Sequence, residues 1–209
     1  MPLVKHEVVE SGAEIALWKI TETVEELVIL LQKGGIYADL PFFRNQNRLA
    51  EWLATRVLLS NLGVQQRVVY DEMGKPHLEG AGKFLSISHS GDMIVVIMHA
   101  SLRVGIDIEK LGERIFKVQH KFVNDSENQW INIATRMEQL YVIWGAKECA
   151  FKIFGLGEID FRDHLTVAPF EFGTRGITEV RFKKGENDCI FRVFFQYLDQ
   201  VMITYAIAS

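Results

Sequence analysis

The chain has 209 residues, of which 48% are hydrophobic and 24% are charged, and this is enough apolar material for the core of one large domain or of two smaller halves. The formal net charge of −4 excludes a broad electrostatic attraction to nucleic acid or to an anionic membrane, so any basic site must be local. The first residues lack the apolar segment of a signal peptide and the longest apolar runs are too short to cross a bilayer, which predicts a cytoplasmic protein with no nucleic-acid or membrane partner.

Residue periodicity predicts a mixture of strands and helices in the first half of the chain. Residues 21–31 are expected to form a helix with Thr21 as its N-cap, and a second helix is expected from about residue 40 to residue 62. Strands are expected at residues 7–20, 68–70, 84–88, 92–99 and 103–109, with a charged, glycine-containing turn at residues 71–75. The last three strands are expected to share one sheet, in which the wholly apolar residues 93–98 form a central strand.

The second half predicts a long helix followed by strands. Residues 110–124 are amphipathic and are expected to be partly helical, and residues 138–154 are expected to form the long helix. Strands are expected at residues 165–168, 178–183, 189–197 and 201–207. Cys149 and Cys189 lack the spacing of a disulfide framework or a metal site, so both are interpreted as ordinary thiols.

Residues 104–109, VGIDIE, place two carboxylates on one side of a predicted strand. Apolar residues alternate with Gly105, Asp107 and Glu109, so one side of the strand would be buried while both carboxylates point from the other. Two anions at this spacing repel one another unless a cation lies between them. Glycine is unfavourable in a strand, which indicates that another backbone or a ligand comes close to Gly105. The alternative is a solvated strand face that pairs with a neighbouring basic residue.

Residues 144–152, WGAKECAFK, place a third carboxylate on the long helix. Around the helix axis Glu148 lies close to Trp144 and Lys152, at the edge of an aromatic stripe, where a carboxylate is costly without a cation. The alternative is a surface ion pair between Glu148 and Lys152. Three carboxylates offer the hard oxygen ligands that Mg²⁺ prefers, and Mg²⁺ usually completes its shell with substrate phosphate. Phosphate-group chemistry is therefore the leading interpretation.

A D-x-E strand followed by a W-x-x-K-E-x-x-x-K helix resembles the phosphopantetheinyl transferase superfamily. It looks most like the longer, single-chain type, which activates fatty-acid, peptide and polyketide synthases. Two further signatures of the family precede it in the expected order, namely residues 74–76 (GKP) and residues 86–90 (SISHS), and a helix with arginines at residues 48–59 precedes both. Each motif alone could be a plain turn or a surface helix, but the four in this order are specific.

The resemblance implies an α+β fold of two similar halves, related by a pseudo-twofold axis, with the active-site cleft between them. The first half would comprise residues 1–102, and the second, residues 103–209, would carry the metal site. The family architecture also implies a monomer whose two halves imitate a dimer. A faint similarity between residues 92–98 and residues 199–205 is in keeping with two related halves.

The resemblance further implies an enzyme of the holo-[acyl-carrier-protein] synthase type, which uses Mg²⁺ to transfer the 4'-phosphopantetheine arm of coenzyme A to a serine of an apo acyl or peptidyl carrier protein. Asp107, Glu109 and Glu148 would hold the metal. Glu148 would also take the serine proton, and Lys152 would stabilise the leaving group. Asp107, Glu148 and Lys152 are thus the expected catalytic residues.

Coenzyme A would be bound by residues from both halves. On the resemblance these are Arg44, Arg48, Arg56, Lys75, Pro76, Ser88, His89, Ser90, Lys147 and Lys152, with the register of the three arginines left open. Gly145 stands where the family often has a small hydroxyl or thiol residue. It is expected to remove a hydrogen bond while keeping the space.

Two other classes of function remain open at this point. One is a non-catalytic module that binds coenzyme A or a carrier protein, and the other is a Mg²⁺-dependent phosphoesterase that uses water instead of serine. The intact acidic and lysine positions count against the first, and the lack of an additional metal-ligand cluster counts against the second. A docking surface for an acidic carrier is expected in the stretch that contains Lys110, Arg114, Ile115, Phe116, Lys117, Lys121 and Phe122, and the alternative is an amphipathic segment that covers the core.

Overall fold

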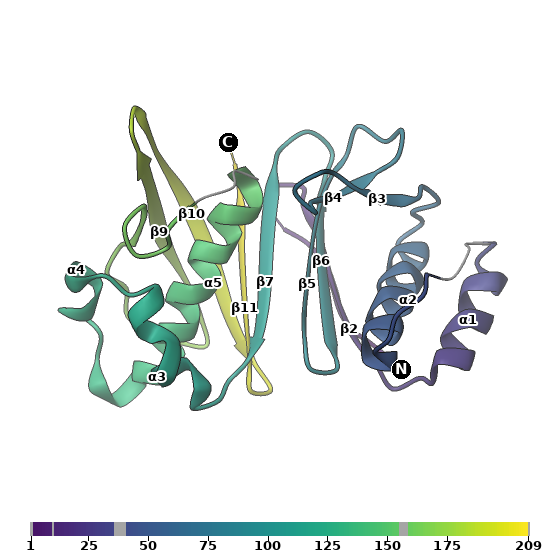
Figure 1. Ribbon diagram of the computed structural model, residues 1–209, viewed down its shortest axis with the longest axis horizontal. Coiled ribbons are helices and arrows are strands. Elements are labelled where there is room, and N and C mark those ends of the chain that lie inside the picture. The colour runs from purple at the N-terminus through teal and green to yellow at the C-terminus, as the bar shows by residue number, and fades with distance from the viewer. Residues whose placement is uncertain (1, 10, 36–40, 155–158, 209) are drawn as a thin grey trace.

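The computed structural model describes residues 2–9, 11–35, 41–154 and 159–208. Within these residues, antiparallel strands form a four-stranded sheet, a five-stranded sheet and a short two-stranded ribbon, and helices lie along the two larger sheets (Figure 1). The predicted mixture of helices and sheets is confirmed in this form.

Residues 3–99 supply the four-stranded sheet and the two helices beside it. Its order is β1-β2-β6-β5, made of β1 (Leu3–Val8), β2 (Glu14–Lys19), β6 (Met93–His99) and β5 (Phe84–Ser90). Helices α1 (Val24–Lys33) and α2 (Gln46–Asn61) pack on it, and β3 (Val68–Tyr70) pairs with β4 (Pro76–Leu78) to form the ribbon. The region predicted as strand at residues 7–20 contains the turn between β1 and β2, and residue 10 lies outside the described residues. β6 is buried along its whole length and lies inside the sheet, as its apolar sequence predicted.

Residues 104–207 supply the five-stranded sheet and the long helix. The order β7-β11-β10-β9-β8 is made of β7 (Val104–Lys110), β11 (Val201–Ile207), β10 (Asn187–Leu198), β9 (Arg175–Lys184) and β8 (Leu165–Val167). The helices are α3 (Arg114–Val118), α4 (Asp125–Asn128) and α5 (Arg136–Phe154), with 3₁₀ turns at Gln119–Lys121 and Ile133–Thr135. The predicted long helix, the partly helical stretch and the four late strands are confirmed.

The expectation that residues 84–88, 92–99 and 103–109 share one sheet is wrong. β5 pairs with β6, but β7 pairs along its whole length with β11, far along the chain, and is the first strand of the other sheet. Consecutive strands are usually neighbours in one sheet, and local periodicity carries no information on a distant pairing partner.

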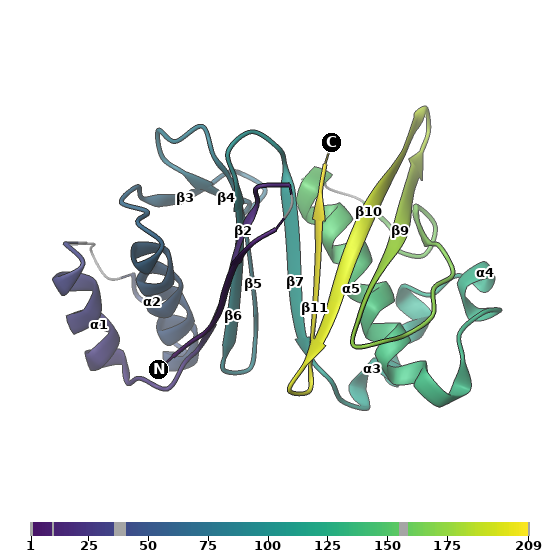
Figure 2. The ribbon, with the colours of Figure 1, turned by 180° about the vertical axis from the view of Figure 1, so that it is seen from behind.

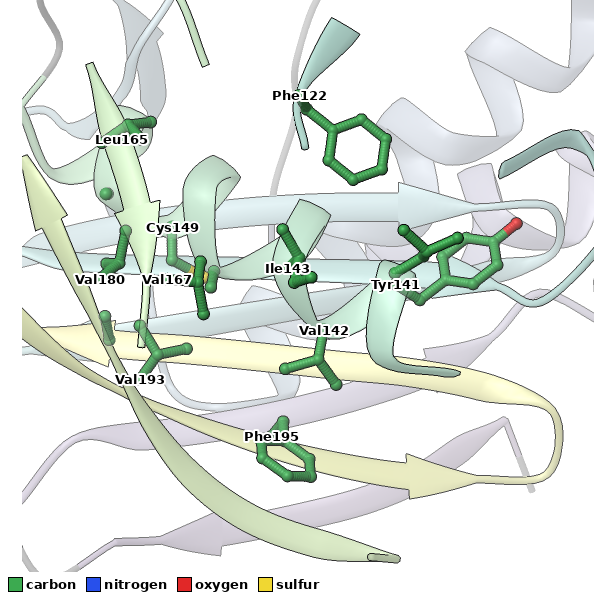
Figure 3. Packing of buried hydrophobic residues seen from close by; sticks show 14 of the residues in the cluster. Phe122, Tyr141, Val142, Ile143, Cys149, Leu165, Val167, Val180, Val193 and Phe195 are labelled. Atoms are coloured by element: carbon green, nitrogen blue, oxygen red, sulfur yellow. The ribbon is translucent and has the colours of Figure 1, made fainter. Parts of the chain in front are cut away.

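The two larger sheets pack against one another, and helices cover their outer faces. Within the described residues, one apolar cluster fills the space between the sheets, with side chains such as Leu17, Val95, Ile106 and Ile203. Another cluster lies between the four-stranded sheet and helices α1 and α2. Figures 1 and 2 show these two helices at one end of the molecule and α3, α4 and α5 toward the other. A further cluster, shown in Figure 3, packs α5 against the five-stranded sheet.

Side-chain caps set the starts of the first two helices. The N-cap of α1 is Thr23 and not Thr21, because the Thr23 hydroxyl accepts from the backbone N–H of Glu26 while the Glu26 carboxylate accepts from the backbone N–H of Thr23. Helix α2 begins after Asn45, later than predicted, and residues 36–40 lie outside the described residues. None of the described helices is long and apolar enough to cross a membrane.

Candidate active site

Strand β7 lies close to helix α5 because residue 105 is a glycine. A Cβ atom at Gly105 would lie 2.3 Å from the backbone oxygen of Cys149, a distance that no side chain can occupy. This confirms the expectation that another backbone approaches Gly105. Asp107 and Glu109 follow on the same side of β7 and so meet the side chains of α5.

Helix α5 lies equally close to β11 at Gly145. A Cβ atom there would lie 2.2 Å from Oγ1 of Thr204, which is buried. The space that the missing side chain of Gly145 leaves is occupied by Thr204 of β11. Burial raises the pKa of the nearby Cys149 thiol, in keeping with its interpretation as an ordinary buried residue.

An ion pair between Asp107 and Lys152 forms the centre of the site. Nζ of Lys152 lies 2.8 Å from Oδ1 of Asp107 and also donates to the backbone carbonyl of Ile106 at 2.8 Å. The Ser88 hydroxyl donates to the same Oδ1 at 2.8 Å and accepts from Lys152 at 3.2 Å. Burial disfavours the charge of Lys152, but Asp107 and Glu148 outweigh it and hold the pKa of Lys152 above its ordinary value. Lys152 is thus a permanent cation at neutral pH.

The other two carboxylates of the site are harder to ionise. Glu148 lies 4.0 Å from Lys152, yet burial and the charge of Asp107 raise the pKa of Glu148 to about 7. Burial and Asp107 also raise the pKa of Glu109, although the Ser90 hydroxyl donates to this carboxylate at 3.1 Å. A carboxylate whose pKa is near 7 is suited to general base catalysis at neutral pH.

The chemistry of Asp107, Glu109 and Glu148 fits a Mg²⁺ site. All three offer carboxylate oxygens, and the pKa values of Glu109 and Glu148 are raised first by burial and then by repulsion from Asp107, both of which a divalent cation would offset. In the part of the chain that the structure describes, no three carboxylate, imidazole or thiol groups come together as a metal cluster, and the cation beside Asp107 is the ammonium of Lys152.

A cavity of about 220 Å³ adjoins the ion pair. It is lined by Met73, Gly74, Lys75, Pro76, Leu85, Ser86, Ile87, Phe151 and Lys152. Its walls come from the turn before β4 and from β5 on one side, and from α5 on the other. Lys75 connects the two sides of the cavity, because its Nζ donates to the backbone carbonyl of Ile153 on α5 at 3.2 Å. Burial together with the charge of Arg103 lowers the pKa of Lys75. The structure thus brings Lys75, Pro76 and Lys152 to one cavity.

Lys147 does not reach this cavity, and the expectation that it binds phosphate is wrong. Its side chain is fully buried and lies 2.8 Å from Glu127. Successive residues of a helix are about 100° apart around the axis, so Lys147 leaves α5 on a different side from Glu148. Glu127 was not among the residues predicted from the sequence. The N-x-x-E pattern that begins at Asn124, which is typical of a capping box and is one here, was the available signal.

Ser88 and Ser90 of β5 form hydrogen bonds with carboxylates of β7, whereas they were expected to bind phosphate. Ser88 donates to Asp107 and Ser90 to Glu109. Ser86 and Ser90 also accept from backbone N–H groups of β7, so alternate serines of β5 join the two sheets. The available signal was the two-residue spacing that these serines share with the carboxylates.

The basic residues of α2 and its surroundings that were expected to bind coenzyme A differ in their exposure to solvent. Arg56 is buried, with its guanidinium carbon 3.4 Å from the ring centroid of Trp52 and a hydrogen bond to the Trp52 carbonyl, so its assignment as a ligand is corrected. Arg44 and Arg48 are exposed. The exposed ring of His89 lies 3.6 Å from Glu51 at the closest atoms, across from α2.

Two of the three apolar residues of the expected docking stretch belong to the core, whereas Phe116 is exposed. Ile115 and Phe122 are buried, whereas Lys117 and Lys121 are exposed. A wide depression of about 740 Å³ lies beside this stretch and is lined by His120, Lys121, Asn124, Asp125, Asp160, Arg162 and Asp163. Its lining contains none of the carboxylates or lysines of the site around Asp107.

The fold and the site together define a protein of helices and antiparallel sheets in which two lysines line a cavity and one of them, Lys152, pairs with a buried carboxylate, an arrangement suited to binding a phosphate group. Residues 103–206 match the family model of the 4'-phosphopantetheinyl transferase superfamily. Through these residues, which carry β7, α5 and the three carboxylates, the chain belongs to that superfamily.

Curated relatives with this activity in their names are similar to parts of the chain. Over 69 residues it is 45% identical to the 4'-phosphopantetheinyl transferase AcpT of Salmonella typhimurium, which covers 32% of this chain and 36% of that protein. Over 115 residues it is 29% identical to the 4'-phosphopantetheinyl transferase gsp of Aneurinibacillus migulanus, covering 52% and 48% of the two chains. Over 112 residues it is 30% identical to AcpT of Escherichia coli O157:H7, covering 50% and 57%. The matched stretches therefore span between 36% and 57% of the length of these relatives.

Proposed function

We propose that the protein transfers the phosphopantetheine arm of coenzyme A to a serine of an apo acyl or peptidyl carrier protein, in a reaction that depends on Mg²⁺. One observation carries the proposal: the ion pair of Asp107 and Lys152, with the perturbed carboxylate of Glu148 beside it, adjoins a cavity that Lys75 and Pro76 also line. The superfamily match of residues 103–206 supports the class of reaction, and the names of the relatives support a transferase.

In this reaction the serine oxygen forms a bond to the phosphorus that bears the pantetheine arm. The bond from that phosphorus to the bridging pyrophosphate oxygen breaks, and adenosine bisphosphate leaves with the electron pair. Glu148, with a pKa of about 7, takes the serine proton. Lys152, held as a cation by Asp107, stabilises the charge that develops on the leaving group.

Asp107, Glu109 and Glu148 would hold Mg²⁺, which when bound supplies charge neutralisation at the pyrophosphate. Lys75 and Pro76 bind coenzyme A within the cavity. The exposed side chains of Arg44, Arg48 and His89 meet the phosphates of its adenosine end. Their exposure is compatible with this role, because a phosphate ligand must be reached from solvent.

The proposal includes an organisation in two halves, residues 1–102 and residues 103–209, related by a pseudo-twofold axis with the active-site cleft between them. The four-stranded sheet lies within residues 3–99 and the five-stranded sheet within residues 104–207, which supports a division near residue 102. The proposal also includes the longer, single-chain type of transferase and a cytoplasmic monomer.

The test is to incubate the protein with coenzyme A, Mg²⁺ and a panel of apo carrier proteins and to measure the mass of each carrier. Wild type should add one phosphopantetheine group, and Asp107→Ala should slow the addition by orders of magnitude. Because this change also leaves Lys152 without its buried partner and lowers stability, the rates are compared at a temperature at which thermal melting shows both proteins to be folded. Asp188→Ala, which removes an exposed carboxylate paired with Arg181, is the matched control and should react like wild type. Release of free 4'-phosphopantetheine and adenosine bisphosphate without a mass change of the carrier would indicate a phosphoesterase, and binding of coenzyme A or carrier without any product would indicate a non-catalytic module.

A further inference from the structure

The turn that carries Lys75 is organised by one residue, Asp71. This turn, residues 71–75, joins β3 to β4, and three of its backbone N–H groups donate to Asp71. Those of Met73 and Lys75 donate to the carboxylate oxygen Oδ1 at 2.9 Å and 2.8 Å, and that of Gly74 donates to the backbone carbonyl at 2.9 Å. The N–H of Asp71 donates in return to the carbonyl of Lys75 at 3.1 Å. Asp71 thus closes the turn through both its side chain and its backbone.

A further contact fixes the direction of the Asp71 carboxylate. Its other oxygen, Oδ2, lies 3.0 Å from Nε2 of His77 on β4. The hydrogen bonds from His77 and from the backbone N–H groups of Lys75 and Met73 hold the pKa of Asp71 below its ordinary value, so the carboxylate is ionised at neutral pH. Because an ionised carboxylate can only accept, His77 donates from Nε2. Both oxygens of Asp71 are therefore held by the turn itself and by the strand that follows it.

The ribbon of β3 and β4 gives this turn little other support. Each strand has three residues, and an isolated two-stranded hairpin is marginally stable in water. The hydrophobic core anchors the ribbon at its open end, where Val68 pairs with Leu78. Asp71 and Met73 lie at the closed end and are exposed. The shape of the turn therefore depends on its own hydrogen bonds, most of which end on Asp71.

The shape of the turn determines where the ammonium of Lys75 lies. Residues 73–76 supply one wall of the cavity of about 220 Å³, and α5 supplies the other with Phe151 and Lys152. From its wall, Lys75 donates to the carbonyl of Ile153 in the last turn of α5 at 3.2 Å. A lysine side chain that is already ordered loses less conformational freedom when it binds an anion than a lysine that is free in solvent.

We propose that Asp71 is a positioning residue for coenzyme A: it holds residues 71–75 in the shape that places the ammonium of Lys75 at the cavity wall, where it binds a phosphate of coenzyme A. His77 orients the Asp71 carboxylate. A carboxylate in direct contact with a phosphate would repel it, so Asp71 contributes through the backbone that it holds. The inference rests on the proposed function for the assignment of Lys75 as a ligand of coenzyme A.

The test measures the dissociation constant of coenzyme A by isothermal titration calorimetry with Mg²⁺ present. Asp71→Ala removes the carboxylate that accepts from the turn and should raise the constant by about 10-fold, a factor that corresponds to the loss of about one hydrogen bond. Asp71→Asn keeps an oxygen that can accept from both N–H groups, and should restore the constant to within about threefold of wild type.

Asp160, between α5 and β8, provides a matched control. Its Oδ1 accepts from the backbone N–H groups of Arg162 at 2.8 Å and Asp163 at 2.9 Å, so it organises a turn in the same way as Asp71. The lining of the cavity contains none of these three residues. Asp160→Ala should therefore leave the dissociation constant of coenzyme A unchanged.

A cycle of variants decides whether Asp71 acts through Lys75. Lys75→Met keeps the apolar stem and removes the ammonium, and in this background Asp71→Ala should weaken binding by less than about twofold further. Amide hydrogen exchange in the free protein is a readout that needs no ligand: the N–H groups of Met73 and Lys75 should exchange faster in Asp71→Ala and more slowly again in Asp71→Asn. Additive losses in the cycle, equal losses in Asp71→Ala and Asp71→Asn, or a lower melting temperature with unchanged affinity for coenzyme A would overturn the proposal.

The same measurements separate this inference from the proposed function. A wild-type protein that binds coenzyme A and gives this pattern of variants but modifies no carrier would support the positioning role and contradict the transfer reaction. A protein that modifies carriers but whose Asp71→Ala variant binds coenzyme A like wild type would do the reverse. Failure of wild type to bind coenzyme A with Mg²⁺ present would overturn the positioning role.

Discussion

Asp107 raises the pKa values of both Lys152 and Glu148, which lie one turn apart on α5. For the lysine, burial disfavours the charged form, but Asp107 and Glu148 favour it and together outweigh burial, so that the pKa rises. For the glutamate, burial and the same anion both disfavour the charged form, so the pKa rises to about 7. One buried carboxylate thus keeps a permanent cation and a titrating acid side by side, which is the combination that the proposed transfer needs.

Stability without metal should therefore fall as the pH rises, through Glu148. Between its ordinary pKa of 4.5 and its folded value of about 7, Glu148 holds a proton in the folded state but not in the unfolded state, so the free energy of unfolding decreases with pH in this window. Above about pH 7, the free energy of unfolding of Glu148→Gln should exceed that of wild type by about 1–3 kcal/mol. Urea unfolding in a chelator, from about pH 5 to about pH 8, measures this difference.

Two additions make this measurement specific. Saturating Mg²⁺ should remove the advantage of Glu148→Gln, because the cation stabilises the charged carboxylate. Glu179→Gln, at an exposed position on β9, is the matched control and should follow the wild-type pH dependence. A constant difference between Glu148→Gln and wild type at all pH values would show that this carboxylate does not titrate near pH 7.

At the scale of elements, two glycines determine how closely α5 approaches the five-stranded sheet. Gly105 admits the helix backbone to β7, and Gly145 admits Thr204 of β11 to the helix. The carboxylates of β7 and the side chains of α5 come within hydrogen-bonding distance only because of this close packing. A helix displaced outward would separate Asp107 from Lys152.

Gly145→Ala should destabilise the protein by about 1–3 kcal/mol, because the added methyl group would overlap with Oγ1 and Cγ2 of Thr204. Combining it with Thr204→Ala, which removes both of those atoms, should cost less than the sum of the two single changes. Thermal or urea unfolding of the four proteins measures the coupling. Gly82→Ala is the control, since a Cβ there would meet no atom within 4 Å. Simple additivity would mean that Thr204 is not the obstacle.

At the scale of the whole molecule, the site lies where the two sheets meet. Alternate serines of β5 donate to the carboxylates of β7 and accept from its backbone N–H groups, and Lys75 reaches from the turn before β4 to the end of α5. A change in how the sheets are joined would therefore alter the carboxylates directly. Lys117 and Lys121, in and just after α3, are exposed. They belong to the part of the chain that also forms the five-stranded sheet (Figure 1).

Reversing two of those charges, Lys117→Glu with Lys121→Glu, should raise the KM for an acidic carrier protein several-fold, by about fivefold or more, and weaken its salt dependence. The KM for coenzyme A should stay unchanged, because the lining of the cavity contains neither residue. Lys33→Glu with Lys183→Glu applies the same change of charge at two other exposed positions and should have little effect. An equal loss in both variants would point to net charge, and an effect on coenzyme A alone would place the carrier elsewhere.

Local sequence was sufficient for most elements and for the direction in which the carboxylates of β7 and the charged side chains of α5 leave their own backbones. The alternation in β7 predicted that Asp107 and Glu109 share a side, and helical spacing predicted that Glu148 and Lys152 share a face of α5. Both patterns depend on backbone geometry that is the same in every protein. The order of the four motifs was sufficient to indicate the superfamily.

Only the tertiary structure decided which partners these side chains meet. The sheet that contains β7 depends on pairing with a strand far along the chain, and the buried positions of Lys147 and Arg56 depend on acceptors that other segments bring to them. The serines of β5 likewise became partners of the carboxylates only when two sheets met. The physical reason is that periodicity gives the direction of a side chain relative to its own backbone, whereas burial, hydrogen bonding and charge pairing depend on what lies opposite.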